Sequence, residues 1–210
     1  MNTALSIYNA LYARYGELNW WPADSPYEVM VGAVLTQNTN WSNVELALAN
    51  FTELSPQFVR DCTTEELIDI IRPAGFFNQK AAYLKAVTAW FEQYDYHIPT
   101  VQRESLEKLR PELLAVKGIG KETADSILLY AFGFPTFIVD AYTVRLCARL
   151  GLELGGKYDT VKAYFEDGLP HDVALYNNYH AMIVVNHKEH CRKLRPLCDT
   201  CPLTEVCPKL

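Results

Sequence analysis

Two groups of residues in this sequence could do chemistry. The first is a single carboxylate, Asp140, which follows the apolar run Phe137-Ile138-Val139 at the predicted start of a helix over 141–150. An Asp at a helix N-terminus most often only caps the helix. The helix dipole also favours the ionised carboxylate, which is the form that accepts a proton or stabilises positive charge. Asp140 is therefore a candidate catalytic residue, with simple capping as the alternative.

The second group is a set of four cysteines near the C-terminus, in a C-x6-C-x2-C-x5-C pattern: Cys191, Cys198, Cys201 and Cys207. Four thiolates this close in sequence suit a tetrahedral zinc ion or an iron–sulfur cluster, and spacing alone separates the two poorly. No signal peptide is recognisable, so metal binding is a better explanation than disulfides. Cys147 lies in a helical run and is expected in the core.

A Gly-Ile-Gly turn, Gly118–Gly120, lies about twenty residues before Asp140, between an apolar helical run and a helix predicted to begin at Lys121. Two glycines let the backbone bend sharply and approach a neighbour closely. The N–H groups at the start of the second helix could bind a phosphate. An ordinary connection between two helices would give the same pattern, with Ile119 buried between them.

The formal net charge of −6 argues against a protein that binds polyanions over its whole surface. Contact with nucleic acid would have to be local. The charge is uneven: Asn186–Arg195 has four Lys or Arg against one Glu, whereas Asp61–Asp69 has four acids and no base. Half of the residues are hydrophobic, enough for a substantial core. No apolar run approaches the ~20 residues of a membrane span, so we predict a cytoplasmic protein without membrane contact.

Helix caps and apolar periodicity predict an all-α fold. The expected helices are Thr3–Tyr15, Pro26–Leu35, Asn43–Phe51, Ser55–Cys62, Thr64–Ile71, Asn78–Tyr94, Glu104–Leu109, Ala141–Leu150, Thr160–Glu166 and Asp172–His187. Pro111 is expected to end one helix before the first helix of the Gly-Ile-Gly hairpin begins. The polar residues 36–41 after the apolar helix Pro26–Leu35 are suited to point into a cleft.

Three stretches, Val116-Lys117-Gly118-Ile119-Gly120, Thr123-Ala124 and Val139-Asp140, resemble the helix-hairpin-helix DNA glycosylases related to endonuclease III. The resemblance covers nearly the whole chain. It implies two helical lobes with DNA and a base pocket between them. One lobe spans 24–135 and ends in the hairpin, 113–131. The other joins 1–23 to 136–210.

The same resemblance implies roles for particular residues. Gly118, Gly120 and Lys121 would bind the DNA backbone, Gln37 would enter the gap left by the extruded base, and Asp140 would drive cleavage of the glycosidic bond. The loop 191–207 would hold a [4Fe–4S] cluster on its four cysteines. Its basic residues would contact DNA phosphates; these are Arg192, Lys193 and Arg195.

Members of the family that also nick the strand carry a lysine that attacks the sugar. That position falls on Glu122 here, and a carboxylate cannot form a Schiff base. Lys121 is one residue early and points roughly 100° away on a helix. We therefore expect no lyase step. Glu122 is expected either to line the base pocket or to be an ordinary first-turn glutamate.

The residues Trp20-Trp21-Pro22, together with 32–39, 72–80 and 117–122, resemble the 3-methyladenine glycosylase branch of the family. That branch stacks the damaged base on aromatic residues equivalent to Trp20, Trp21 and Trp41, and Tyr27 adds to the aromatic density. Alkylated purines are cationic, and aromatic faces attract cations. The resemblance implies a monomeric, nucleoid-associated glycosylase that hydrolyses alkylated purines such as 3-methyladenine from double-stranded DNA. A lyase acting on damaged pyrimidines and a non-catalytic lesion-binding protein are the alternatives.

Overall fold

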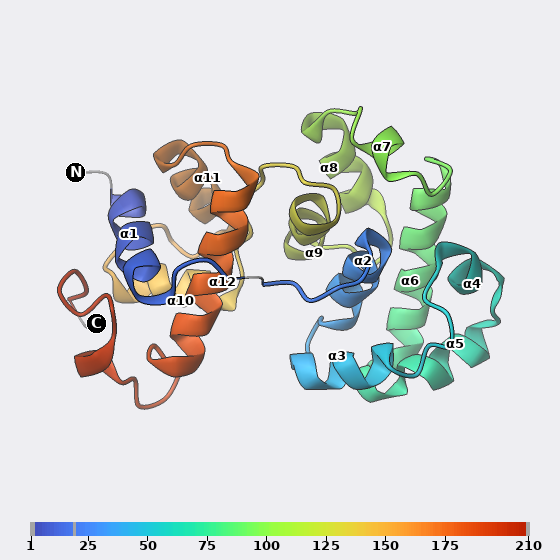
Figure 1. Cartoon of the computed structure of the whole chain (residues 1–210), viewed down its shortest axis with the longest axis horizontal. Helices are drawn as coiled ribbons and strands as arrows, with labels where there is room; N and C mark the ends of the chain where they lie inside the picture. The colour runs from blue at the N-terminus through green and yellow to red at the C-terminus, as the bar shows by residue number, and fades with distance from the viewer. Residues whose placement is uncertain (1–2, 19, 209–210) are drawn as a thin grey trace. The chain divides into compact units, whose positions relative to one another are not determined.

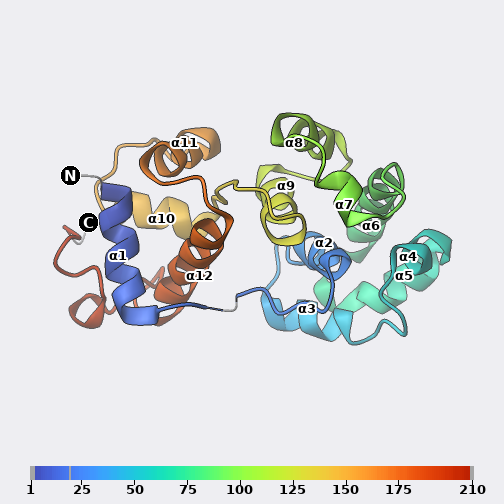
Figure 2. The same cartoon turned by 45° about the horizontal axis from the view of Figure 1, so that its top comes forward.

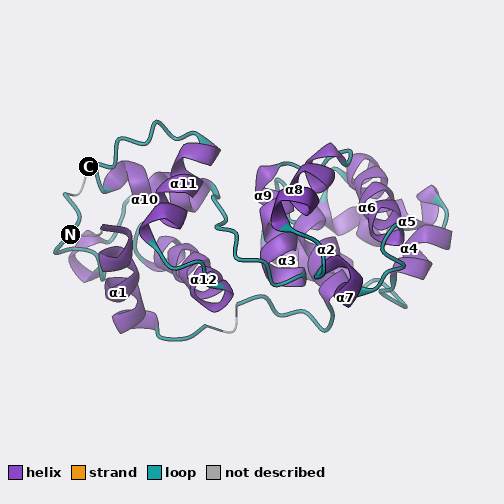
Figure 3. Cartoon of the chain, turned by 90° about the horizontal axis from the view of Figure 1, so that it is seen from above, coloured by secondary structure: helices purple, strands orange, loops and turns teal. Residues whose placement is uncertain are grey.

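A computed structural model of the chain describes residues 3–18 and 20–208, and its regular elements are all helices, which confirms the all-α prediction (Figures 1 and 3). The contacts divide the chain into two compact units. The first combines Met1–Pro22 with Pro135–Leu210, and the second is Ala23–Phe134. Residues 1–2, 19 and 209–210, which fall within the predicted lobe of 1–23 and 136–210, lie outside the described residues.

The second unit contains α2 (Pro26–Leu35), α3 (Trp41–Leu48), α4 (Pro56–Asp61), α5 (Thr64–Ile71), η1 (Arg72–Ala74), α6 (Phe77–Glu92), α7 (Ile98–Val101), α8 (Leu106–Ala115), α9 (Lys121–Ser126) and the π-helical turn η2 (Ile127–Ala131) that continues α9. Helix α2 is almost wholly buried and packs against α6 and η2. Its start is fixed by Ser25, whose hydroxyl accepts from the Glu28 N–H, with Pro26 at the first helical position. The second hairpin helix, α9 with its continuation η2, therefore packs on a buried core helix, and α8 packs on α9.

Pro111 does not end a helix, and that prediction is wrong. Helix α8 runs from Leu106 through Pro111 to Ala115, so the predicted helix Glu104–Leu109 and the first hairpin helix are one element. A proline here leaves the carbonyl of Glu107, four residues earlier, without a helical donor. Glu107 is exposed in the first turn of α8, where water can satisfy that carbonyl. The short helix α7 was not predicted.

A buried lysine joins two turns of the second unit. The Lys80 side chain on α6 is 1% exposed, and its Nζ donates to the carbonyls of Leu35 and Ala74 at 2.8 Å each. Burial lowers the pKa of Lys80 to about 8. The lysine thus ties the C-terminus of α2, which leads to Gln37, to the turn that precedes α6.

The first unit packs α1 (Thr3–Tyr15) and α11 (Tyr158–Gly168) with α10 (Ala141–Arg149) and α12 (Val173–Glu189) (Figure 2). Its core is aromatic: the Phe137 and Phe165 rings stack at 4.4 Å, and Tyr179 reaches the Ala4 carbonyl at 2.9 Å. Cys147 is 3% exposed, as predicted for a core residue. Among the described residues, no helix is long and apolar enough to cross a membrane.

Candidate functional site

The Gly-Ile-Gly hairpin connects α8 and α9 in the second unit. The Ile119 N–H donates to the Val116 carbonyl at 3.1 Å, and Ile119 is 4% exposed, as predicted. Gly120 is the N-cap of α9, and as a glycine it offers no side chain to the N–H groups of the first turn. The hairpin thus presents a helix N-terminus that its own cap residue does not cover, which is the geometry in which a helix receives an anion.

The structure requires glycine at only one of the two glycine positions of the hairpin. Gly118 adopts φ +82°, and an added Cβ would lie 2.1 Å from the Tyr83 ring, so both its backbone and its packing require glycine. Gly120 adopts an ordinary φ of −86°, and apart from its chain neighbours no heavy atom of the described residues lies within 4 Å of an added Cβ. The fold therefore does not explain Gly120, whereas close approach of a ligand would.

Side chains from outside the turn hold the hairpin in place. Gln37 donates from Nε2 to the Gly118 carbonyl at 3.1 Å and to the Thr123 hydroxyl at 2.9 Å. Arg110 on α8 pairs with the fully buried Asp125 on α9 through two bonds of 2.8 and 3.0 Å. Sequence reasoning missed this ion pair, because fifteen residues separate its partners and nothing local marks them.

The structure brings Gln37, Gly118 and Gly120 together with the start of α9. Lys121 and Glu122 are both exposed in the first turn of that helix. Gln37 is turned onto the hairpin, so both hydrogens of its amide group are committed within the protein. Its entry into a DNA gap, like the pocket role of Glu122, stays a prediction.

Asp140 lies in the first unit, as the N-cap of α10. One oxygen, Oδ1, accepts from the Thr143 N–H at 2.7 Å and from the Thr143 hydroxyl at 2.8 Å. The other, Oδ2, lies 3.4 Å from Nε2 of His180, and the Asp140 side chain is 11% exposed. Burial raises the pKa of this carboxyl, but His180 and Thr143 outweigh burial and hold the pKa below its ordinary value. The structure thus favours the ionised form.

The four cysteines of the loop line one small cavity together with Arg149, His190, Pro196 and Thr204. Burial raises the pKa of the Cys201 thiol, and the neighbouring Cys191 and Cys207 add to that effect. Arg149 on α10 donates from Nη1 to the Cys191 sulfur at 3.0 Å. Within 3–18 and 20–208, no three Cys, His, Asp or Glu side chains converge as the ligands of a single ion would. Four thiols that line one cavity have the chemistry to bind a metal ion or an iron–sulfur cluster.

The basic residues of this loop are exposed: Arg192, Lys193 and Arg195. The guanidinium of Arg149 donates from Nη2 to the carbonyls of Arg192 and Lys193, at 2.9 and 3.4 Å. The backbone that carries these cations is therefore tied to the helix that Asp140 caps.

The predicted base-stacking residues divide between the units. Trp20 and Trp21 are half-buried and Pro22 is exposed in the first unit, where the Lys188 ammonium lies 5.6 Å from the centre of the Trp20 ring. Trp41 is half-buried at the start of α3 in the second unit. Tyr27 does not belong in this group. It is 5% exposed and its hydroxyl bonds to Thr88 at 2.6 Å, because it lies on the core face of α2.

Phe76 is a surface feature that sequence reasoning did not single out. It is 60% exposed and its backbone is left-handed, with φ +48°. Such a conformation is an outlier for a bulky side chain and is often found at functional sites. The Gly-Phe-Phe sequence of residues 75–77 was the available signal.

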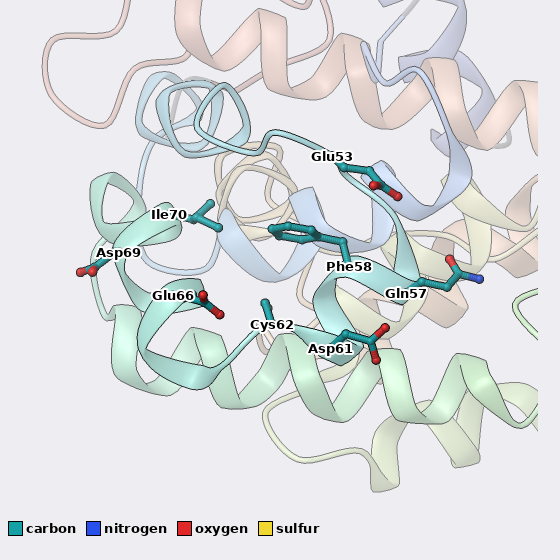
Figure 4. Close-up of a pocket in the computed structure, with 8 residues that line it drawn as sticks. All are labelled: Glu53, Gln57, Phe58, Asp61, Cys62, Glu66, Asp69 and Ile70. Carbon is teal, nitrogen blue, oxygen red and sulfur yellow. The ribbon is translucent and has the colours of Figure 1, made fainter.

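A cavity of about 620 Å³ in the second unit lies between α4 and α5, and Figure 4 shows that carboxylates surround its apolar floor of Phe58 and Ile70. The acidic residues are Glu53, Asp61, Glu66 and Asp69. Figures 1 and 3 place α4 and α5 at the end of this unit away from α9. Negative charge repels a phosphate backbone, so the lining of this cavity is unsuited to contact with DNA.

Comparison with known proteins agrees with this geometry. Residues 31–171 match the model of the HhH-GPD superfamily base excision DNA repair protein family. A protein of Methanocaldococcus jannaschii named "Putative DNA repair glycosylase" is 46% identical over 207 residues, which cover 96% of this chain and 94% of that protein. Endonuclease III of Sulfolobus acidocaldarius is 29% identical, with 86% of this chain and 81% of that protein covered.

Among solved structures, the 3-methyladenine DNA glycosylase of Helicobacter pylori bound to 1,N6-ethenoadenine superimposes with a TM-score of 0.77 at 28% identity. The match covers 89% of this chain and 97% of that one. The family model spans the hairpin, Gln37 and Asp140, which are the features that the structure shows to be held in place by specific contacts. The chain belongs to the HhH-GPD superfamily of base excision DNA repair proteins.

Proposed function

We propose that this protein is a monofunctional DNA glycosylase that hydrolyses the N-glycosidic bond of alkylated purines such as 3-methyladenine in double-stranded DNA. The observation that carries the proposal is Asp140, a carboxylate that stays ionised although its side chain is largely buried. A glycosylase must stabilise the positive charge that develops on the sugar as the base departs. An ionised carboxylate close to C1′ would supply that charge.

Asp140 would also orient the attacking water and accept its proton. The water oxygen forms the new bond to C1′, while the base leaves with the electron pair of the glycosidic bond. A cationic alkylated purine becomes neutral as it takes that pair. The leaving base therefore needs no proton, and one carboxylate suffices.

The hairpin would hold the DNA backbone next to the damaged nucleotide. Support comes from the open space over Gly120, which leaves room for a phosphate against the first turn of α9. Lys121 is exposed beside it and adds a positive charge. Phe76 is an exposed aromatic that could insert between base steps, as apolar wedges do in proteins that distort DNA.

Hydrolysis rather than strand nicking is proposed because Glu122 occupies the position that carries the reactive lysine in bifunctional members. The preference for alkylated purines rests on the half-buried Trp20, Trp21 and Trp41, whose faces would attract a cationic base. The H. pylori 3-methyladenine glycosylase at 28% identity supports the same substrate class.

We also propose that Cys191, Cys198, Cys201 and Cys207 hold a [4Fe–4S] cluster. The cluster would order the loop that carries the basic residues, which has few buried side chains of its own. DNA phosphates would then be contacted by Arg192, Lys193 and Arg195. The protein would bind its substrate as a monomer. Iron and sulfide content of protein purified without oxygen, with Cys198→Ser and Cys201→Ser as comparisons, tests this assignment.

The substrate proposal is tested by incubating the protein with DNA treated with a methylating agent and identifying the released bases by mass spectrometry. Release of 3-methyladenine without strand cleavage is expected. A parallel incubation with abasic-site DNA and borohydride examines the alternative of a bifunctional lyase. Covalent trapping of the wild-type chain, or release of damaged pyrimidines alone, would overturn the proposal. DNA binding without any base release would favour a lesion-binding protein.

A further inference from the structure

The two oxygens of the Asp140 carboxylate have different surroundings. Oδ1 accepts two hydrogen bonds from Thr143, one from the backbone and one from the hydroxyl, and both are shorter than 2.9 Å. That oxygen is committed to capping α10. Oδ2 is the oxygen that remains for chemistry, so the group that faces Oδ2 decides how the carboxylate is presented.

That group is the imidazole of His180. Its Nε2 lies 3.4 Å from Oδ2, and the side chain of His180 is 9% exposed. His180 lies in the buried central part of α12, between Tyr179 and Ala181, so the helix fixes where its ring can go. The separation is long for a hydrogen bond, but contacts of this kind in free enzymes often shorten when the substrate is bound.

We propose that His180 is the positioning residue of Asp140: by donating from Nε2 to Oδ2, it orients the carboxylate and keeps it ionised for base excision. The inference rests on the proposed function, because it assigns Asp140 the catalytic role. His180 acts only through Asp140 and touches no substrate. The imidazole places a donor opposite Oδ2, whereas both donors of Thr143 bind Oδ1.

Other charged groups around this pair do not replace His180. His187 lies closer to the C-terminal end of α12 than His180 does. Burial lowers the pKa of His187 to about 4, so this side chain is neutral near pH 7. Arg145 on α10 lies over the Tyr142 ring, 5.2 Å from its centre. At the start of α11, the Tyr158 hydroxyl accepts from the Val139 N–H at 3.4 Å. Thr143 binds the opposite oxygen, so His180 is the residue placed to act on Oδ2.

The test measures single-turnover release of methylated base with enzyme in excess over methylated duplex DNA. His180→Leu removes the donor, and His180→Gln keeps a side-chain N–H. We expect His180→Leu to slow release by about ten- to a hundredfold, the range for losing a hydrogen bond to a charged group. DNA affinity should stay within twofold. His180→Gln should recover most of the rate, and the exposed His171→Gln serves as the matched control.

Two further readouts separate positioning from a purely structural role. Burial raises the pKa of Asp140 and His180 lowers it, so removing His180 should raise that pKa. The acid limb of the pH–rate profile should therefore move to higher pH. In an Asp140→Asn background, His180→Leu should cause no additional loss, because the residue through which it acts is gone. A melting temperature close to wild type confirms that the variants are folded.

The outcomes are distinguishable. If His180→Leu stays within twofold of wild type at every pH, or slows the Asp140→Asn variant further, the positioning role is refuted while the proposed function stands. If Asp140→Asn keeps the wild-type rate, the proposed catalyst itself is refuted. Should His180→Leu fail to fold, His180→Phe, which keeps a flat ring but has no donor, decides by its pH profile. A profile shifted to higher pH supports the inference, and an unshifted profile at the wild-type rate overturns it.

Discussion

The two glycines of the hairpin should respond to the same substitution in opposite ways. In Gly118→Ala, the new methyl group would overlap the Tyr83 ring, whose Cδ1 lies 2.1 Å from the added Cβ. The left-handed backbone adds about 1–2 kcal/mol for an L residue, and relieving the overlap adds about 1–3 kcal/mol. We expect Gly118→Ala to lower the free energy of unfolding by roughly 2–5 kcal/mol.

In Gly120→Ala, the methyl group lies more than 4 Å from every atom in the described part of the chain other than its chain neighbours, and φ of −86° is ordinary for alanine. The loss of stability should be below about 1 kcal/mol, the cost of replacing glycine by a poorer N-cap. The methyl group would instead occupy the space proposed for a phosphate. We expect DNA affinity to fall about tenfold, which is 1.4 kcal/mol of binding free energy.

Equilibrium urea unfolding measures the first effect, and fluorescence anisotropy with a duplex containing a stable abasic-site analogue measures the second. Titrations at two salt concentrations show whether the lost contact is to a phosphate, since that loss lowers the salt dependence. Unchanged DNA binding by Gly120→Ala would refute the claim that its open space receives the backbone. Wild-type stability of Gly118→Ala would refute the packing argument.

Three further variants address the hairpin, the pH dependence and the missing lyase step. Asp125→Ala removes the buried partner of the Arg110 guanidinium. Urea unfolding should show a free energy of unfolding lower by about 3–5 kcal/mol; a loss below about 1 kcal/mol would contradict the claim that this ion pair holds the two hairpin helices together. Burial lowers the pKa of His187 to about 4 in the folded state, against 6.5 in the unfolded state. Between these two pH values the unfolded state therefore binds a proton that the folded state does not bind. Stability should therefore fall as pH drops from 6.5 towards 4, at up to about 1.4 kcal/mol per pH unit, and part of that slope should vanish in His187→Phe; identical slopes would refute the assignment. Glu122→Lys should make the protein trappable on abasic DNA by borohydride, whereas Glu122→Gln should not; failure to trap the lysine variant would show that this position does not reach the sugar.

Local signals predicted several element boundaries well. Helices α1, α2 and α5 begin and end at the predicted residues. Ser25-Pro26 and the Thr63–Glu66 capping box specify the starts of α2 and α5 in the sequence itself. The prediction that Pro111 ends a helix was wrong because it ignored the surroundings of the Glu107 carbonyl, which water can satisfy at the exposed start of α8. Tyr27 was misplaced because aromatic content does not say which face of a helix is buried.

The contacts that shape the candidate site were harder to predict, since they join residues far apart in sequence. Gln37 binds a hairpin more than eighty residues away, and His180 faces a carboxylate forty residues earlier. A spacing rule within one helix cannot find such pairs. The sequence indicated which residues could do chemistry, whereas folding decided that one oxygen of Asp140 caps a helix and the other faces an imidazole.

The most direct test of the central claim is single-turnover hydrolysis of methylated duplex DNA in water labelled with oxygen-18, by the wild type and by Asp140→Asn. The wild type is predicted to release 3-methyladenine and leave an unbroken abasic strand that carries one labelled oxygen at C1′. The asparagine variant is predicted to bind the same DNA and to release the base at least about a hundredfold more slowly. Equal release by both proteins, or a product strand attached to the enzyme, would contradict the account.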